Sequence, residues 1–306
     1  LYRLFRKEKP EIVHSITPKA GLLSMLAAKA AGVPVRMHTF TGLIFPTRTG
    51  LMQKLLIKMD RLLCWAATNI YPEGNGVKQD LISYKITSKP LKVLANGNVN
   101  GIDLNRFNPE AISEQDRTQL KNELRITDDD FVFVFVGRIV GDKGINELIS
   151  ALEGIKGKTT KPIKLLMVGS YESELDPLLP ETLDKIDNNK HIIAVGYQND
   201  VRPYFAISDA LAFPSYREGF PNVVIQAGAM ELPAIVSDIN GCNEIIIDGK
   251  NGLIIPSKDE QALLDAMVRI VDDEPLYQKL KRNARPMIES RYEQSVVWEA
   301  LLEEYE

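Results

Sequence analysis

The 306-residue sequence lacks several features that would assign its class directly. Its two cysteines, Cys64 and Cys242, lie far apart and outside any CxxC or Cys/His spacing, so no disulfide framework is expected and both thiols are predicted to be reduced. No run of about 18 apolar residues is present, which argues against a membrane-spanning helix. The sequence also has no cluster with metal-ligand spacing, no internal repeat and no low-complexity tract. These absences favour a cytosolic globular protein without a bound metal.

The composition is ordinary, but the charge is unevenly divided along the chain. A hydrophobic content of 44% and a charged content of 25% are typical of soluble domains, and the length predicts about two domains. Residues 1–64 contain eleven Lys and Arg against three acids, a net charge of +8 in a chain whose total is −4. This basic part predicts an anionic surface or substrate. Nucleic acid is not expected, because the region lacks interleaved aromatic residues and any nucleic-acid motif.

The most informative stretch runs from residue 215 to residue 241. An apolar run before it predicts the end of a strand, a turn passes through Glu218, and Pro221 is expected to be the first residue of a helix. Free amide groups and the helix dipole make such a helix end a site for an anion such as phosphate. Because a carboxylate does not bind an anion, Glu218 is expected to hold sugar hydroxyl groups. The amides at the helix end are those of Asn222, Val223 and Val224.

This stretch resembles the donor-site motif of family 4 retaining glycosyltransferases, which have the GT-B fold. In that motif seven residues separate two Glu residues; Glu218 is the first here, and Gln226 stands in place of the second. The resemblance implies that Glu218 holds the donor sugar and that Gln226 contacts the ribose of the nucleotide. An amide lacks the charge that strengthens such hydrogen bonds, so a weaker contact is expected. The motif further places in the donor site Gly219, Phe220, Pro221, Asn222 and Val223.

A second element of the same family follows an apolar strand predicted over residues 131–136. Gly137 and Arg138 come directly after this strand, and Lys143 opens the next predicted helix, which resembles the family's GR…KG element. In that element the Arg and Lys hold the donor diphosphate and offset charge on the departing nucleotide. The resemblance therefore assigns Arg138 and Lys143 to catalysis together with Glu218. Enzymes of this fold generally need no catalytic metal, so no cofactor is expected.

Two later predicted strands complete the expected donor site. They cover residues 164–168 and 191–195 and end in Gly169 and Gly196. In the family, residues after the second of these strands lie against the base, so Gly196 and Tyr197 are expected there. Tyr197 could instead serve only as packing in a strand-end turn.

The first part of the chain predicts a parallel sheet, with strands over residues 11–15 and 33–39 around a helix over 18–31. This segment resembles the corresponding unit of the family's acceptor domain. His14 and His38 fall at the carboxyl ends of their strands, where open α/β sheets bind ligands. We assign His14 a catalytic role and His38 an acceptor-side role, with strand capping or filling of a polar gap as the alternative.

The start of the family's acceptor domain is not recognisable. Further strands are expected over residues 68–71 and 91–94, which makes about four strands before the linker. A complete acceptor domain of this family opens with a strand and a glycine-rich loop, and neither is present. The N-terminal domain is therefore expected to be incomplete at its start.

A helix predicted over residues 51–64 has two interpretations. Apolar residues recur at helical spacing on one face, while Lys54, Lys58 and Arg61 share another. The apolar face could pack on the sheet, leaving the basic face in solvent. Alternatively, this helix and the loop before it touch a membrane surface, with the acceptor-side Lys54 and Lys58 near anionic headgroups or a lipid diphosphate.

We therefore predict an α/β protein of the GT-B fold, in which two Rossmann-like domains have parallel sheets facing a central cleft. The acceptor-side domain is expected over residues 1–107, the donor-binding domain over 108–288, and a C-terminal helix over 289–306 is expected to cross back to the first domain. The resemblance implies a retaining glycosyltransferase of bacterial surface-glycan synthesis. Its expected donor is a UDP-sugar, its acceptor an undecaprenyl-diphosphate-linked sugar, and its location the cytoplasm, peripherally on the inner membrane surface. A non-catalytic nucleotide-sugar-binding protein and a sugar-nucleotide epimerase are the alternatives.

Overall fold

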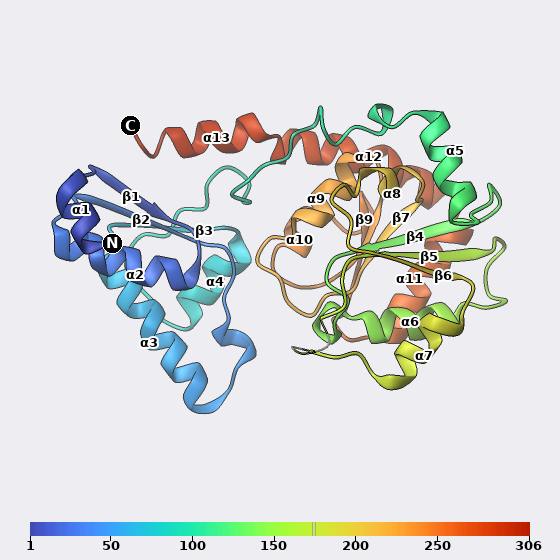
Figure 1. The fold of residues 1–306 in the computed structure, drawn as a ribbon, viewed down its shortest axis with the longest axis horizontal. Coiled ribbons are helices and arrows are strands. Elements are labelled where there is room, and N and C mark those ends of the chain that lie inside the picture. The colour runs from blue at the N-terminus through green and yellow to red at the C-terminus, as the bar shows by residue number, and fades with distance from the viewer. Residues whose placement is uncertain (173, 175) are drawn as a thin grey trace. The chain divides into compact units, whose positions relative to one another are not determined.

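The computed structural model describes residues 1–172, 174 and 176–306, which form two compact units (Figure 1). The first unit comprises Leu1–Gly101 together with Gln294–Glu306, and the second comprises Ile102–Glu293. Each unit is built around a parallel sheet with helices packed against it. The predicted α/β fold class is confirmed.

The first unit contains a three-stranded sheet in the order β1-β2-β3. Helices α2 and α3 pack together on one face of this sheet, and α13 lies against the other face, where two of its residues share a small cavity with residues of β1, β2 and β3. The elements of this unit are α1 (Tyr2–Glu8), β1 (Ile12–Ser15), α2 (Pro18–Ala31), β2 (Val35–Phe40), the 3-10 helix η1 (Phe45–Thr47), α3 (Gly50–Ala66), β3 (Asn69–Pro72), α4 (Asn75–Ser83) and α13 (Gln294–Leu302).

The second unit contains a six-stranded parallel sheet in the order β6-β5-β4-β7-β8-β9. Helices α6, α7 and α11 cover one face, and α8, α9 and α12 cover the other (Figure 1). Its elements are η2 (Pro109–Ala111), α5 (Glu114–Glu123), β4 (Phe131–Val136), η3 (Gly141–Lys143), α6 (Ile145–Gly154), β5 (Ile163–Val168), α7 (Pro180–Asn188), β6 (Ile192–Gly196), α8 (Arg202–Ala206), β7 (Ala210–Phe213), α9 (Asn222–Ala229), β8 (Ala234–Ser237), α10 (Cys242–Ile245), β9 (Gly252–Ile255), α11 (Glu260–Asp272) and α12 (Glu274–Tyr292).

Local sequence explains the best-defined elements. Strand β4, with the sequence FVFVFV, is buried over its first five residues, as expected for a central parallel strand covered on both faces. Helix α2 begins after Thr17 with Pro18 in its first turn and ends at Gly32, whose φ of +79° is easily adopted only by glycine. Both elements have the predicted limits.

The strand predicted over residues 91–94 is wrong. Only Leu91 forms a bridge, with Ile70 of β3, and the chain then leaves the sheet. Pro90 has no N–H group to donate to a ladder, and Ala95 adopts a positive φ of 46°, which interrupts an extended path. The Lys92 side chain instead forms an ion pair with Glu304.

The order of strands in the second unit determines where loops converge. Connections run from β4 through β5 to β6 in one direction, and from β7 through β8 to β9 in the other. The carboxyl ends of β4 and β7 are therefore neighbours at the point where the direction reverses. In open α/β sheets, such a reversal leaves a crevice that binds ligands.

Two glycines bring the ends of β4 and β5 into close contact. Gly137 and Gly169 have φ values of +154° and +152°, and a Cβ atom on Gly169 would collide with the carbonyl oxygen of Gly137. Gly137 N donates a hydrogen bond of 2.9 Å to Val168 O. A side chain at position 169 would push these two strand ends apart.

The chain enters and leaves the second unit at adjacent positions. Ile102 N donates a hydrogen bond of 2.8 Å to Tyr292 O, and Ile102 forms a bridge with Glu293. The first and last residues of the second unit are therefore tied together by backbone hydrogen bonding.

The described helices show no candidate for crossing a bilayer, since none combines enough length with enough apolar character. Helix α3, however, carries a carboxyl group in an unfavourable environment. Asp60 lines a mostly apolar cavity, and burial raises its pKa to about 6. Burial of a carboxyl group disfavours its ionised form.

Replacing Gly169 by Ala should destabilise the second unit by about 3 kcal/mol or more, because left-handed strain adds to the collision with Gly137. The matched control is Gly157→Ala, since Gly157 has a φ of +72° but no atom within 4 Å of its Cβ position. The control should cost only about 1 kcal/mol. Urea denaturation followed by circular dichroism measures the free energy of unfolding of both variants. Equal losses of stability would show that the close approach of Gly169 to Gly137 O imposes no constraint of its own.

Replacing Asp60 by Asn should stabilise the first unit at neutral and alkaline pH. The folded pKa lies above the unfolded value of 3.8, so the ionised carboxylate costs stability above about pH 6 and that cost fades as the pH falls toward 3.8. We expect a gain of roughly 1 to 3 kcal/mol near pH 8 and a smaller gain near pH 4.5. Thermal unfolding at both pH values tests this, with Glu8→Gln on the exposed α1 as control; a gain that does not depend on pH would contradict it.

Candidate active site

Two side chains that are 75 residues apart in sequence meet at the carboxyl edge of the second unit's sheet. Lys143 ends η3, which follows β4, and Glu218 lies in the loop after β7. The Lys143 Nζ and Glu218 Oε1 atoms form an ion pair, with the two side chains 15% and 16% exposed. Removal from water strengthens the attraction between the charges and fixes both side chains.

Ser215 holds Glu218 in place. Its hydroxyl group donates a hydrogen bond of 2.8 Å to Glu218 Oε1, and the residue itself has no exposed surface. Ser215 was not among the predicted site residues.

Backbone and side-chain contacts join the loops that carry the ion pair. Tyr216 N donates a hydrogen bond of 2.9 Å to Asp142 O, and Arg217 Nη2 lies 3.0 Å from Asp142 Oδ2. The Phe213 ring centroid lies 5.8 Å from Lys143 Nζ, near the outer limit of a cation–π contact. Asp142 was also missed, and its role as a link between the loops became evident only from the fold.

Helix α9 begins beside Glu218, one residue later than predicted. Pro221 is the N-cap residue rather than the first helical residue, because its ψ of 109° is extended, and the helix proper starts at Asn222. Phe220 anchors the preceding turn: it is almost fully buried, and its ring centroid lies 5.6 Å from that of Tyr292. The positive end of the α9 dipole is thereby fixed beside the ion pair.

A glycine allows the neighbouring loop to press on this turn. A Cβ atom on Gly241 would lie 2.5 Å from Gly219 O and 2.7 Å from the Cα atom of Phe220. Cys242, the next residue, is fully buried, and the pKa of its thiol is raised by burial and further by the charge of Glu218. A protonated Cys242 therefore packs beneath the site as a small apolar side chain.

The remaining donor-side residues lie along the same edge. Arg138 follows β4 and is half exposed; its Nη1 donates a hydrogen bond of 2.8 Å to Glu172 Oε2, not to Glu218. Gly196 ends β6 with a φ of +69°, and the following Tyr197 is 71% exposed. Strands β6, β5, β4 and β7 are consecutive in the sheet, so their carboxyl ends form a row.

Gln226 lies one helical turn after Asn222 on α9 and is partly buried. Residues four apart lie on the same face of a helix, so Gln226 lies on the same face of α9 as Asn222, one turn further from the amino end. Val223, the second residue of the helix, is also partly buried. The structure thus places the whole predicted motif from Glu218 to Gln226 in one turn and the first turns of α9.

His14 lies in the first unit and is hydrogen-bonded through both ring nitrogens. Tyr305 Oη is 2.6 Å from its Nδ1, and Thr39 Oγ1 is 2.8 Å from its Nε2. The residue borders a cavity of about 40 Å³ together with Val297 and Leu301 of α13. Burial lowers the pKa of His14, so the ring is held neutral beneath the C-terminal helix.

His38 occupies a core position. Its side chain has no exposed surface, its Nδ1 lies 2.8 Å from Ser15 Oγ, and a Cβ atom on Gly21 would collide with its ring. Burial, and to a lesser extent the charge of His14, lowers its pKa to about 3. A side chain without exposed surface does not contact an acceptor directly. His38 therefore fills a polar gap in the core, which is the alternative to an acceptor-side role.

Helix α3 does not bury most of its apolar face. Among the apolar residues at helical spacing, Leu63 is buried, whereas Leu51 is 84% exposed. Lys54 and Lys58 are exposed as well. The interpretation in which the apolar face packs on the sheet is therefore wrong for most of its length. The further exposed apolar residues of this helix are Met52, Leu55, Met59 and Leu62.

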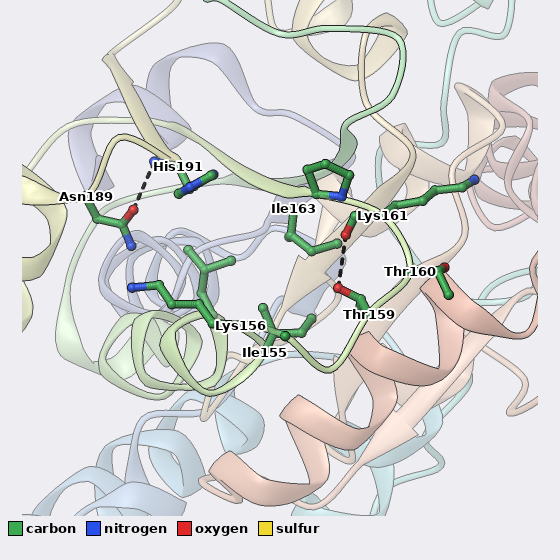
Figure 2. Close-up of a pocket in the computed structure, with 11 residues that line it drawn as sticks. Ile155, Lys156, Thr159, Thr160, Lys161, Ile163, Asn189 and His191 are labelled. Carbon is green, nitrogen blue, oxygen red and sulfur yellow. Dashed lines mark hydrogen bonds between the residues drawn. The ribbon is translucent and has the colours of Figure 1, made fainter.

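A separate cavity of about 380 Å³ lies at the opposite edge of the second unit's sheet (Figure 2). It is bordered by the residues that begin β5 and precede β6, including Ile163 and His191, and by Lys156 after α6. It contains none of the predicted donor-site residues. Across the described ranges, His, Cys, Asp and Glu side chains do not gather in threes or more in a way that could hold a metal ion.

Family comparisons cover nearly the whole chain. Residues 116–287 match the family described as "Glycosyl transferases group 1", and residues 1–106 match "Glycosyltransferase Family 4". The first match includes Arg138, Lys143 and the stretch from Glu218 to Gln226.

Two curated relatives are similar over most of their length. The capsular polysaccharide biosynthesis glycosyltransferase CapM of Staphylococcus aureus is 32% identical over 305 residues, which are 97% of this chain and 77% of that protein. The UDP-Gal:alpha-D-GlcNAc-diphosphoundecaprenol alpha-1,3-galactosyltransferase of Escherichia coli is 29% identical, covering 90% of this chain and 70% of that protein.

Solved structures show the same fold. The crystal structure of Anabaena Alr3699/HepE in complex with UDP has a TM-score of 0.85 at 18% identity, covering 99% of this chain and 80% of that one. The sucrose-phosphate synthase of Thermosynechococcus elongatus has a TM-score of 0.78 at 21% identity, covering 99% and 75%. Together with the family matches, these findings show that the chain belongs to the family 4 glycosyltransferases of the GT-B fold.

Proposed function

We propose that this glycosyltransferase transfers a sugar from a UDP-sugar to an undecaprenyl-diphosphate-linked sugar, with retention of configuration, in the synthesis of a bacterial surface glycan. The observation that carries the donor part is the ion pair between Lys143 and Glu218 at the carboxyl edge of the six-stranded sheet. The names of the relatives support the pathway and the acceptor class: one acts in capsular polysaccharide biosynthesis, and another is named for a diphosphoundecaprenol acceptor.

In the proposed mechanism, the positive charges act on the leaving diphosphate. The bond between the sugar C1 and the diphosphate oxygen breaks, a bond from C1 to the acceptor oxygen forms, and the proton of the acceptor hydroxyl passes to the departing diphosphate, on which negative charge has developed. Lys143, Arg138 and the amino end of α9 offset that charge. Because these groups supply the positive charge, we propose that transfer needs no metal cofactor.

Glu218 fixes the sugar. Lys143 and Ser215 both contact its Oε1 atom, so Oε2 can accept a hydrogen bond from a sugar hydroxyl. A carboxylate held by two partners loses little conformational freedom when the sugar binds, which favours an oriented ring. Gln226 would bind the ribose, and the exposed ring of Tyr197 would lie against the base.

Helix α3 supports a place at the membrane surface. Its exposed apolar residues and its exposed Lys54 and Lys58 form adjacent strips, as in helices that lie in the interface of an anionic bilayer. Peripheral binding to the cytoplasmic face would bring the enzyme to a lipid-linked acceptor. His14, held beneath α13, would act on the acceptor side by positioning Tyr305 and Thr39.

Lys143→Ala and Glu218→Gln should each lower kcat by roughly 10² to 10³ while the fold is kept, because each removes a group that acts on the transition state. The assay measures transfer of radiolabelled sugar from UDP-sugars to an undecaprenyl-diphosphate sugar, with chelator present. The control Lys156→Ala removes an exposed lysine paired with Glu153 and should have no effect. Near-normal transfer by either site variant would refute the site assignment, and release of an altered sugar without acceptor would indicate an epimerase.

The protein should bind UDP more tightly than GDP or ADP in calorimetry, and Gln226→Glu should strengthen UDP binding about fivefold, because a charged acceptor makes stronger hydrogen bonds to the ribose. Gln261→Glu on α11 is the matched control and should leave binding unchanged. A preference for GDP or ADP would change the proposed donor. An unchanged affinity in Gln226→Glu would remove Gln226 from the ribose site.

A further inference from the structure

The first unit contains an apolar cavity of about 450 Å³. It lies between α2, the segment that follows β2, and α3, and its volume falls within the roughly 300–1,000 Å³ of small-molecule sites. Its border includes Lys19, Leu23, Phe40, Leu56, Met59 and Asp60.

The cavity opens at the ligand-binding edge of its sheet. Pro18 and Lys19 begin α2 directly after β1, and Phe40 is the last residue of β2. Both segments therefore lie at the carboxyl ends of parallel strands, which is where open α/β sheets bind ligands. The positive end of the α2 dipole lies on the same rim.

The chemistry of the lining fits a ligand with an apolar body and an anionic end. Apart from Lys19 and Asp60 the bordering residues are glycine or apolar. Lys19, Lys54 and Lys58 have no ion-pair partner within the part of the chain that the structure describes. These uncompensated cations belong to the segment with a net charge of +8.

Asp60 is the one bordering acid. Burial already raises its pKa to about 6, so an apolar ligand that removes more water would favour the neutral carboxyl group. Asp60 then presents no charge to the ligand.

The cavity continues into the exposed strip of α3. Met59 borders the cavity and is itself exposed, and Leu55 and Leu62 lie on the same side of the helix. Exposed apolar side chains of α3 therefore continue from the border of the cavity along one side of the helix. A ligand that entered along this strip would come from a bilayer rather than from water.

We propose that this cavity binds the phosphate-proximal part of the polyprenyl chain of a lipid-linked acceptor, with the phosphates at Lys19 and the amino end of α2. The inference rests on the proposed function, because it assumes a lipid-linked acceptor. A polyprenyl chain is chosen over the acyl chains of a phospholipid because a relative is named for a diphosphoundecaprenol acceptor, and because the cavity lies at the carboxyl edge of its sheet, where open α/β sheets bind specific ligands. Binding in this cavity would thus set the distance between the membrane surface and the sugar of the acceptor.

The test uses farnesyl diphosphate as the probe, with calorimetry on the full chain and UDP titrated in parallel. Leu56→Trp fills the cavity, and Leu23→Gln makes its rim polar at a position exposed enough to spare the fold. Each variant should weaken farnesyl diphosphate binding at least about tenfold, because the tryptophan occupies the space of the chain and the glutamine places a polar group against it. UDP binding should not change. Leu183→Trp on α7, an exposed leucine of the second unit, is the matched control and should bind both ligands normally.

The head and the chain are tested separately. Lys19→Gln should weaken binding of farnesyl diphosphate but not of farnesol, because only the former carries phosphates. Equal binding of farnesyl diphosphate to the wild type, Leu56→Trp and Leu23→Gln would overturn the proposal, and so would equally tight binding of dodecyl phosphate, which would indicate a site for any anionic lipid. Failure of the wild type to bind UDP would instead refute the proposed donor. The binding of farnesyl diphosphate to the cavity would still be interpreted separately.

Discussion

The candidate site of the second unit is organised by one ion pair between two loops. Lys143 and Glu218 come from the ends of β4 and β7, which are neighbours at the reversal of strand order, and Ser215 and Asp142 hold the two loops together. Two opposite charges in a partly dehydrated site position each other before any substrate arrives. The two charges also compensate each other, so neither side chain is left buried and unpaired.

Much of the fold could be predicted from sequence because its signals are local. The FVFVFV run of β4 and the Thr-Pro start and Gly end of α2 each specify an element within a few residues. The donor motif could be recognised for the same reason, since Glu218 to Gln226 form one turn and one helix start. The strand predicted over residues 91–94 failed because pairing needs a partner edge, and the backbone turns at Ala95 before a ladder can form.

Burial and long-range contacts could not be predicted. His14 and His38 are each the penultimate residue of their predicted strands, but the register pairs His14 with Met37 and His38 with Ser15, so the two side chains lie on opposite faces of the sheet. His14 borders a cavity under α13, and His38 is enclosed by Ser15 and Gly21. The periodicity of α3 is that of a helix packed on a core, but the fold leaves most of its apolar face exposed. In both cases the sequence pattern defines a face, and only the packing decides what covers it.

The backbone link between Ile102 and the end of α12 makes the second unit an insertion with adjacent ends. A unit attached at a single place can be exchanged as a block, because only two peptide junctions at one spot have to be rebuilt. The first unit, including α13, is then free to diverge separately from the second. Under the proposed function, a lineage acquires new acceptors by exchanging one unit while the ion pair of the other is kept.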